Sequence, residues 1–155
     1  MNLKYRKGIF LVTYSIEDEK VQYLILKRKL HWRGWEFPKG GVNPNEGMGH
    51  AAKRELREET GLKVLAIKKF NVFGKYKYEK PLKDRQGFIG QSYVLYAAEI
   101  KMGKVKLDRI EHSGYKWLGF KDALRTLTWP NQKKCLRIVN KWLEKHRKAY
   151  KYSKN

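Results

Sequence analysis

Cysteine is nearly absent from this sequence: among its 155 residues only Cys135 carries a thiol. A single cysteine excludes an intramolecular disulfide, which agrees with a reducing compartment. The first apolar stretch, residues 8–15, is too short to span a bilayer, and no small-residue cleavage site follows it. These absences predict a cytoplasmic protein that uses no disulfide and has no membrane partner.

Acidic residues are also scarce, since 15 Asp and Glu stand against 36 Lys and Arg and give a formal net charge of +21. Such a surface attracts polyanions and speeds their encounter with the protein. Nucleic acid is one candidate polyanion and a polyphosphate substrate is another. A lysine-rich proteome, such as that of a thermophile, produces the same balance without either partner. The charge alone therefore selects none of these three interpretations.

The hydrophobic content of 41% and the aromatic content of 14% are those of a chain that folds. No repeat, low-complexity segment or linker divides the sequence, so one domain over residues 1–155 is expected. Strand patterns cover residues 8–15, 21–28, 62–78, 88–100 and 114–118, and helical patterns cover 47–60, 121–127 and a segment that begins near Pro130. This mixture predicts an α/β or α+β sandwich.

The segment between residues 30 and 46 is rich in glycine and proline and is expected to be a loop. The helix that follows contains Gly47 and Gly49, which are poor helix residues, so we expect it to become regular only after them. Gly61 is well placed to end this helix.

This predicted helix carries a cluster of carboxylates. Residues three and four apart share a helix face, so Glu55, Glu58 and Glu59 project together. Carboxylates this close repel one another, and Mg²⁺ resolves the repulsion because it prefers oxygen ligands. Gly40 lets the backbone of the preceding loop approach such an ion or a phosphate closely. A solvated acidic face is the alternative, but it does not explain a Gly-Pro-rich loop leading into the cluster.

These residues resemble the Nudix box, G-x5-E-x7-R-E-U-x-E-E-x-G-U with U aliphatic. The match holds at every fixed position, namely Gly40, Glu46, Arg54, Glu55, Leu56, Glu58, Glu59, Gly61 and Leu62. The resemblance implies a Nudix-type α/β/α sandwich with a mixed sheet, in which the box forms a loop-helix-loop. It also implies Mg²⁺ or Mn²⁺ held chiefly by Glu55 and Glu59, with Glu58 assisting and the Gly40 carbonyl joining the metal shell. Arg54 would orient a carboxylate.

Two further segments resemble diadenosine tetraphosphate hydrolases and bacterial RNA 5′-pyrophosphohydrolases of the same family. They are the lead-in Trp-Glu-Phe-Pro-Lys-Gly-Gly at 35–41 and Glu-His-Ser-Gly-Tyr-Lys-Trp-Leu-Gly at 111–119. The second implies that Glu111 supplies a late carboxylate, which we expect to be the general base. An ammonium at Lys39 beside the metal can neutralise a phosphate that the metal leaves uncovered. The resemblance favours a dinucleotide substrate, because the dinucleotide hydrolases carry lysine at this position, whereas the RNA enzymes often carry glutamine.

Aromatic residues are candidates for the rest of a substrate site. Tyr76 and Tyr78 lie two apart on a predicted strand and therefore share a face, where they could contact substrate or pack into the core. His31, Trp32 and Trp129 are weaker candidates, and His112 is expected to be a loop histidine without a function.

The resemblance implies a hydrolase that splits a pyrophosphate linkage, with a dinucleoside polyphosphate such as diadenosine tetraphosphate as the expected substrate. An RNA 5′-end pyrophosphohydrolase is the alternative, for which the charge of +21 would be the electrostatic signature. A non-catalytic nucleotide or RNA binder is a third hypothesis, against which the intact set of carboxylates argues. The oligomeric state is left open.

Overall fold

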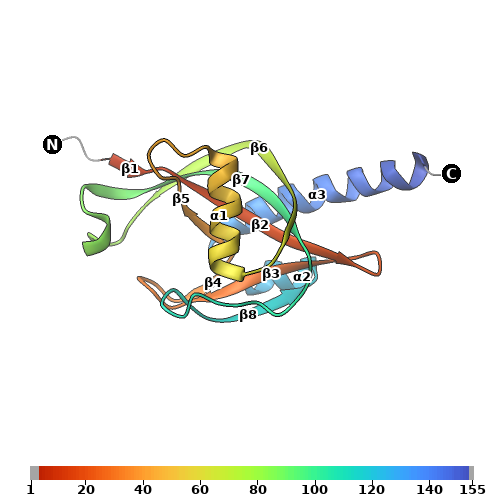
Figure 1. Cartoon of the computed structure of the whole chain (residues 1–155), viewed down its shortest axis with the longest axis horizontal. Coiled ribbons are helices and arrows are strands. Elements are labelled where there is room, and N and C mark those ends of the chain that lie inside the picture. Colours follow the sequence, from red (N-terminus) through yellow and green to blue (C-terminus); the bar gives the residue numbers. More distant parts are fainter. Residues whose placement is uncertain (1–3, 154–155) are drawn as a thin grey trace.

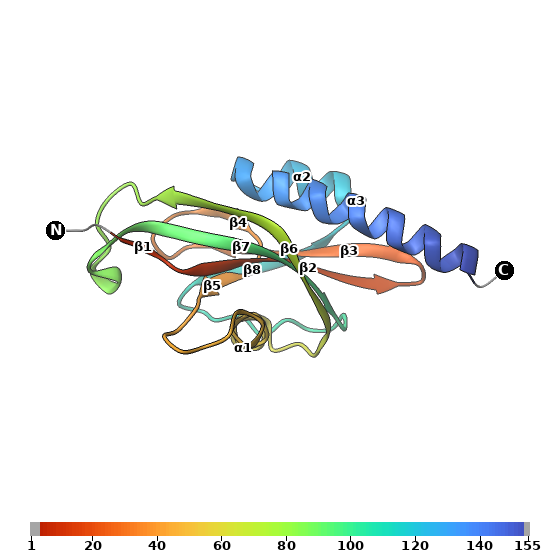
Figure 2. The ribbon, with the colours of Figure 1, turned by 90° about the horizontal axis from the view of Figure 1, so that it is seen from above.

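The computed structural model describes residues 4–153, and its elements stack in three layers (Figure 1). An eight-stranded sheet lies between α1 (Met48–Thr60) on one face and α2 (Phe120–Thr126) with α3 (Pro130–Ser153) on the other (Figure 2). The predicted α/β/α sandwich is therefore confirmed. None of the described helices is long and apolar enough to cross a membrane.

The sheet is mixed. Its strands are β1 (Lys4–Arg6), β2 (Gly8–Glu17), β3 (Lys20–Arg28), β4 (Gly34–Glu36), β5 (Lys39–Gly41), β6 (Val64–Lys77), β7 (Phe88–Ile100) and β8 (His112–Leu118), and a short 3-10 turn, Lys83–Arg85, precedes β7. β2 runs parallel to β7 and antiparallel to β3. β6 pairs with the other edge of β7, and β8 pairs with β3.

The core is built on both sides of β2. Ile9 and Leu11 belong to the cluster beneath α1, whereas Phe10, Val12 and Tyr14 belong to the cluster beneath α3. A strand that is buried on both faces reads as a continuous apolar run. This burial explains why β2 is easily recognised in the sequence.

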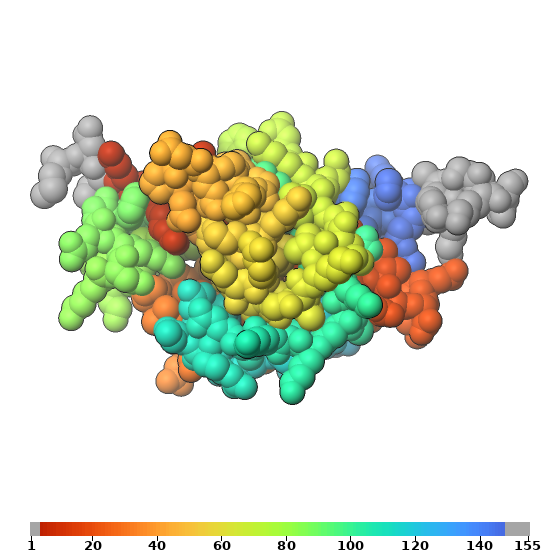
Figure 3. All heavy atoms as spheres, viewed as in Figure 1, coloured from red at the N-terminus to blue at the C-terminus, as the bar shows by residue number. Residues whose placement is uncertain are grey.

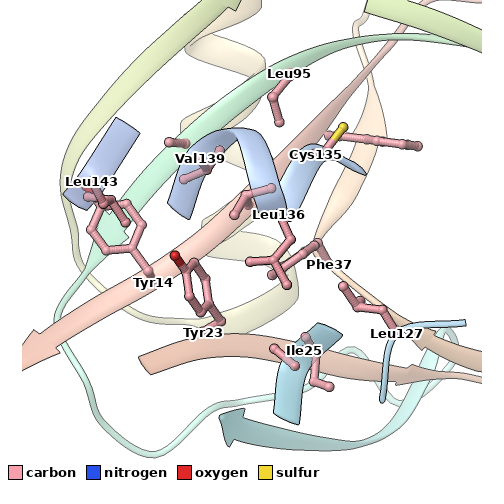
Figure 4. Close-up of a cluster of buried hydrophobic side chains, with 14 residues drawn as sticks. Tyr14, Tyr23, Ile25, Phe37, Leu95, Leu127, Cys135, Leu136, Val139 and Leu143 are labelled. Carbon is pink, nitrogen blue, oxygen red and sulfur yellow. The ribbon is translucent and has the colours of Figure 1, made fainter. Parts of the chain in front are cut away.

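α3 covers the larger cluster with one apolar stripe. Cys135, Leu136, Val139 and Leu143 recur at helical spacing, and all four point into the core (Figure 4). Such a stripe buries apolar area on one face of the helix and leaves the other to solvent. The helix predicted to begin near Pro130 is therefore present and packs its apolar face on the core.

α1 begins earlier than expected, because Gly49 lies inside its first turn. The Ala51 amide donates to the Gly47 carbonyl at 2.9 Å, so the helical ladder is already formed there. One glycine costs a helix about 1 kcal/mol, and burial of Ala51, Ala52 and Leu56 against the sheet offsets that cost. The end of the helix is as predicted: Gly61 has a left-handed φ of 68°, and its amide donates to the Arg57 carbonyl.

The segment predicted as a loop contains two three-residue strands, β4 and β5. β4 pairs with β3 and β5 pairs with the start of β2. Strands this short have no periodicity of their own, so only their partners identify them. β1 was missed for the same reason. β5 places Lys39 and Gly40 next to α1.

Candidate active site

α1 places two carboxylates over β5. Glu55 and Glu59 lie one turn apart on the face toward the sheet, where the Glu59 residue is 3% exposed. Glu58 lies at the rim with its side chain 57% exposed. The three carboxylates therefore differ in burial, and a solvated acidic face does not describe Glu59, because the buried face of the helix that carries Leu56 also includes it. In the space-filling view α1 covers the centre of this side of the molecule (Figure 3).

Arg54 on α1 holds the preceding loop against the helix through hydrogen bonds. Its guanidinium donates to both oxygens of Glu46 at 2.8 and 2.9 Å and to the Gly41 carbonyl at 2.9 Å. The same group reaches Glu55 at 3.0 Å and Glu58 at 3.3 Å. A planar guanidinium with five donors suits this kind of multiple recognition. Arg54 is thus placed to orient carboxylates, as the family resemblance implies.

Gly40 lies against the Glu55 carboxylate. A Cβ built on Gly40 would stand 2.0 Å from the Glu55 carboxyl carbon. The neighbouring Lys39 amide donates to Glu59 Oε2 at 3.3 Å. The absence of a side chain at Gly40 therefore allows β5 and α1 to meet with two carboxylates between them.

The described residues balance the charges of these carboxylates only in part. Burial, with smaller contributions from Glu58 and Glu111, raises the pKa of Glu55 to about 7 against the opposing effect of Arg54. Burial also raises the pKa of Glu59 well above its ordinary value, and Glu55, Glu111 and Glu36 add to the effect. A divalent cation would supply the missing positive charge. Glu55 and Glu59 offer the oxygen donors that a hard divalent cation prefers, so the residues present suit such an ion.

Gly40→Ala should lower metal-dependent turnover about 100-fold and leave the fold intact. The new methyl group collides with the end of the flexible Glu55 side chain, which can move at small cost in stability. A displacement of about 1 Å in a catalytic group can reduce the rate by this factor. Steady-state kinetics with thermal unfolding tests the prediction, with Gly119→Ala as control because a Cβ there meets nothing within 4 Å. Unchanged turnover would show that the position of Glu55 is not critical.

Glu111 and His112 meet this centre from the start of β8. Arg28, buried at the end of β3, donates to Glu36 at 3.3 Å and to Glu111 Oε2 at 3.4 Å. His112 is fully buried, and its Nε2 lies 3.0 Å from Glu36 Oε2. The expectation of a loop histidine is wrong, because β8 begins two residues earlier than predicted and pairs His112 with Arg28. The four side chains form one buried network beside Glu59.

Lys39 stands between this network and an aromatic pocket. Its Nζ lies 3.5 Å from Glu36 Oε1, 3.2 Å from the Tyr76 hydroxyl and 4.2 Å from the centroid of the Trp32 ring. A cation over an aromatic face is attracted by the ring quadrupole. The pocket has a volume of ≈ 380 Å³, and its aromatic and charged lining is Phe10, His31, Trp32, Lys39, Tyr76, Lys77, Tyr78, Glu79, Lys80 and Trp129.

Both predicted tyrosines line this pocket, and their rings meet edge to face with centroids 6.3 Å apart. Tyr76 also packs against the core beneath α3, so this residue both lines the pocket and contacts the core. The weaker candidates His31, Trp32 and Trp129 line the same pocket. They lie far from the tyrosines in sequence, and only the fold brings them to the same cavity.

A smaller polar pocket adjoins the first and shares Phe10, Lys39 and Tyr76 with it. Its charged lining is Arg6, Arg28, Lys39, Arg85, Glu55 and Glu111. Burial and the nearby Arg85 lower the pKa of Arg6. A bound anion would therefore stabilise the charged form of Arg6. The three arginines were missed, because no spacing in the sequence connects β1, β3 and the turn before β7.

The Nudix domain profile matches residues 5–138 of this chain. An RNA pyrophosphohydrolase of Nitratiruptor sp. is 29% identical over 147 residues, which cover 89% of this chain and 95% of that protein. An 8-oxo-dGTP diphosphatase of Buchnera aphidicola is 36% identical over 97 residues, with coverages of 63% and 64%.

Among solved structures, an Ap4A hydrolase of C. elegans in a binary complex superposes with a TM-score of 0.71 at 26% identity. The match covers 90% of this chain and 98% of that one. The profile spans most of the chain and includes the loop, helix and carboxylates described above. This chain therefore belongs to the Nudix family of hydrolases.

Proposed function

We propose that this hydrolase splits a dinucleoside polyphosphate, with diadenosine tetraphosphate cleaved to ATP and AMP. The observation that carries the proposal is that the two pockets adjoin and share three lining residues, Phe10, Lys39 and Tyr76. One pocket offers aromatic faces to a base, and the other offers arginines and carboxylates to a phosphate chain with its metal. A substrate with a nucleoside at the end of a long polyphosphate fits both.

Glu55 and Glu59 are the proposed principal ligands of Mg²⁺ or Mn²⁺, with Glu58 and the Gly40 carbonyl assisting. When bound, the ion neutralises phosphate charge and lowers the pKa of a water molecule. Arg54 holds Glu55 in place through their 3.0 Å contact. Glu111 accepts the proton of the attacking water, and its 31% exposed side chain leaves room for that water at the mouth of the site.

Arg6, Arg28 and Arg85 line the small pocket together with Glu55 and Glu111 and would bind the phosphate chain. Guanidinium groups match phosphate oxygens in pairs. Tyr76 and Tyr78 would contact the nucleoside, and Lys39 would bind the phosphate that lies between the two pockets. The similarity to a protein named Ap4A hydrolase across nearly the whole fold supports this assignment.

Lys39→Gln should raise KM for the tetraphosphate about tenfold or more and lower kcat less. A charge-assisted hydrogen bond contributes about 1.5–3 kcal/mol, and a contact present in both ground and transition states acts on KM. Steady-state kinetics decides the matter, with Lys53→Gln on the exposed side of α1 as control. An unchanged KM would remove Lys39 from the binding site.

The substrate itself is tested with a panel of diadenosine tetraphosphate, ATP, ADP-ribose, 8-oxo-dGTP and 5′-triphosphorylated RNA. The expected result is the highest kcat/KM for the tetraphosphate, with ATP and AMP as the only products. A preference for any other compound would overturn the assignment. A chain inactive on every compound in Mg²⁺ and in Mn²⁺ would instead favour the non-catalytic binder.

RNA with a 5′-triphosphate is the second candidate substrate. Two observations favour it, namely the charge of +21 and the similarity to an RNA pyrophosphohydrolase. Electrostatic binding of RNA falls steeply with salt. If RNA is the substrate, kcat/KM on the RNA should fall steeply between roughly 50 and 200 mM salt, the range over which phosphate contacts weaken. Over the same range, kcat/KM on diadenosine tetraphosphate should fall much less.

A further inference from the structure

His112 has a ring nitrogen with no partner in the part of the chain that the structure describes. The residue is 0% exposed, and its Nε2 lies 3.0 Å from Glu36 Oε2. Its Nδ1 is also buried and has no hydrogen-bond partner among the residues that the structure describes. Buried polar atoms are nearly always paired. The unpaired Nδ1 of a histidine that lies in a group of carboxylates therefore points to a missing ligand.

The contact with Glu36 determines which nitrogen carries the proton. The ionised Glu36 carboxylate can only accept a hydrogen bond, so Nε2 donates. Three other side chains, Arg28, Trp32 and Lys39, also lie within 3.5 Å of this carboxylate and hold it in place. In the neutral ring the lone pair then lies on Nδ1. A carboxylate behind an imidazole is the arrangement that orients metal-binding histidines.

Two carboxylates complete the set. Glu59, Glu111 and His112 each offer a ligand atom, and these atoms lie within 4.8 Å of one another. In a tetrahedral site, ligands bound at about 2.1 Å stand about 3.4 Å apart, so the ligand atoms must approach one another by up to about 1.4 Å to close on an ion. Glu59 is buried and Glu111 half-buried, so both are held by their surroundings.

We propose that Glu59, Glu111 and His112 form a mixed oxygen–nitrogen metal site that takes Zn²⁺ or Mn²⁺ in preference to Mg²⁺. Imidazole nitrogen is a poor ligand for Mg²⁺ and a good one for transition metals, with Zn²⁺ above Mn²⁺ in affinity. This site rests on the proposed function, because both use Glu59 and Glu111. It adds a nitrogen ligand, His112, to the oxygen ligands of the metal. Oε2 of Glu111 accepts from Arg28, which leaves Oε1 to bind the ion or to accept a proton.

The decisive measurement is pulsed EPR of Mn²⁺ bound to the tag-free full chain, without substrate. Protein labelled with ¹⁵N-histidine should show nitrogen hyperfine coupling to the ion. The coupling should persist when His31, His50 and His146, the other three histidines of the chain, are changed together to Gln. It should disappear in His112→Gln. Wild-type protein without nitrogen coupling, or a His112→Gln protein that retains it, would overturn the proposal.

Calorimetric titration gives an independent test. His112→Gln should weaken Zn²⁺ binding about 10- to 100-fold, the loss typical of a perturbed metal shell, and change Mg²⁺ binding less than about twofold. His146→Gln is the control, because that exposed ring stacks on Trp142 at the surface of α3. Equal losses for both metals would contradict the nitrogen ligand. Neither experiment uses a nucleotide, so both stand if the proposed substrate is wrong.

Discussion

Glu59→Gln should reduce turnover at least about 100-fold, a loss ordinary for a group that stabilises charge in the transition state. At the same time, the metal-free protein should unfold at an equal or higher temperature at neutral pH. The Glu59 carboxylate is buried, and one backbone amide, that of Lys39 at 3.3 Å, reaches it. Its raised pKa means that the charged form opposes folding at neutral pH, and a glutamine of the same shape removes that charge. Activity and metal-free stability should therefore move in opposite directions.

The matching measurement is thermal unfolding with and without Mg²⁺. A metal that binds only the folded state raises the midpoint temperature, so wild type should gain stability from Mg²⁺ and the variant should gain little. Glu144→Gln on the exposed side of α3 is the control for loss of one negative charge. A Glu59→Gln protein with most of the wild-type turnover at saturating Mg²⁺ would refute the ligand assignment.

Glu111→Gln should lower kcat by about 10²- to 10⁴-fold, the usual contribution of a positioned general base. Arg28 holds one oxygen of Glu111 at 3.4 Å, so the side chain already faces the centre without a loop movement. The glutamine keeps the volume and loses the ability to accept a proton. kcat must be measured at saturating metal, so that a weaker ion affinity does not enter the comparison.

The size of this effect decides between two bases. A fall of less than about threefold is far below what a base contributes and would transfer the role to Glu55, whose pKa is raised to about 7. Asp122→Asn, an exposed change on α2, measures the background effect of removing a carboxylate.

The long elements could be predicted from the sequence because each carries its own periodicity. α3 shows its stripe of Cys135, Leu136, Val139 and Leu143, and β2 shows an unbroken apolar run. β4 and β5 have three residues each, and their strand character comes from pairing with β3 and β2. No local pattern contains that information.

The metal-binding half of the site was predictable because its residues are close in sequence and repeat at the spacing of a helix. Glu55 and Glu59 needed only the geometry of α1. Trp32, Arg6 and Arg85 come from separate segments, and they meet only through the order of the strands. The burial of Glu59 and of His112 was also out of reach, because burial depends on what packs above a side chain.

The buried position of Cys135 makes this protein a convenient background for site-directed labelling. Packing beneath α3 raises the pKa of the thiol to about 11, so the reactive thiolate is scarce at neutral pH and reagents cannot reach it. A cysteine introduced at exposed Lys80, on the rim of the aromatic pocket, would be the one fast-reacting thiol. A fluorophore there would report nucleotide entry, while slow modification of Cys135 would time the opening of α3.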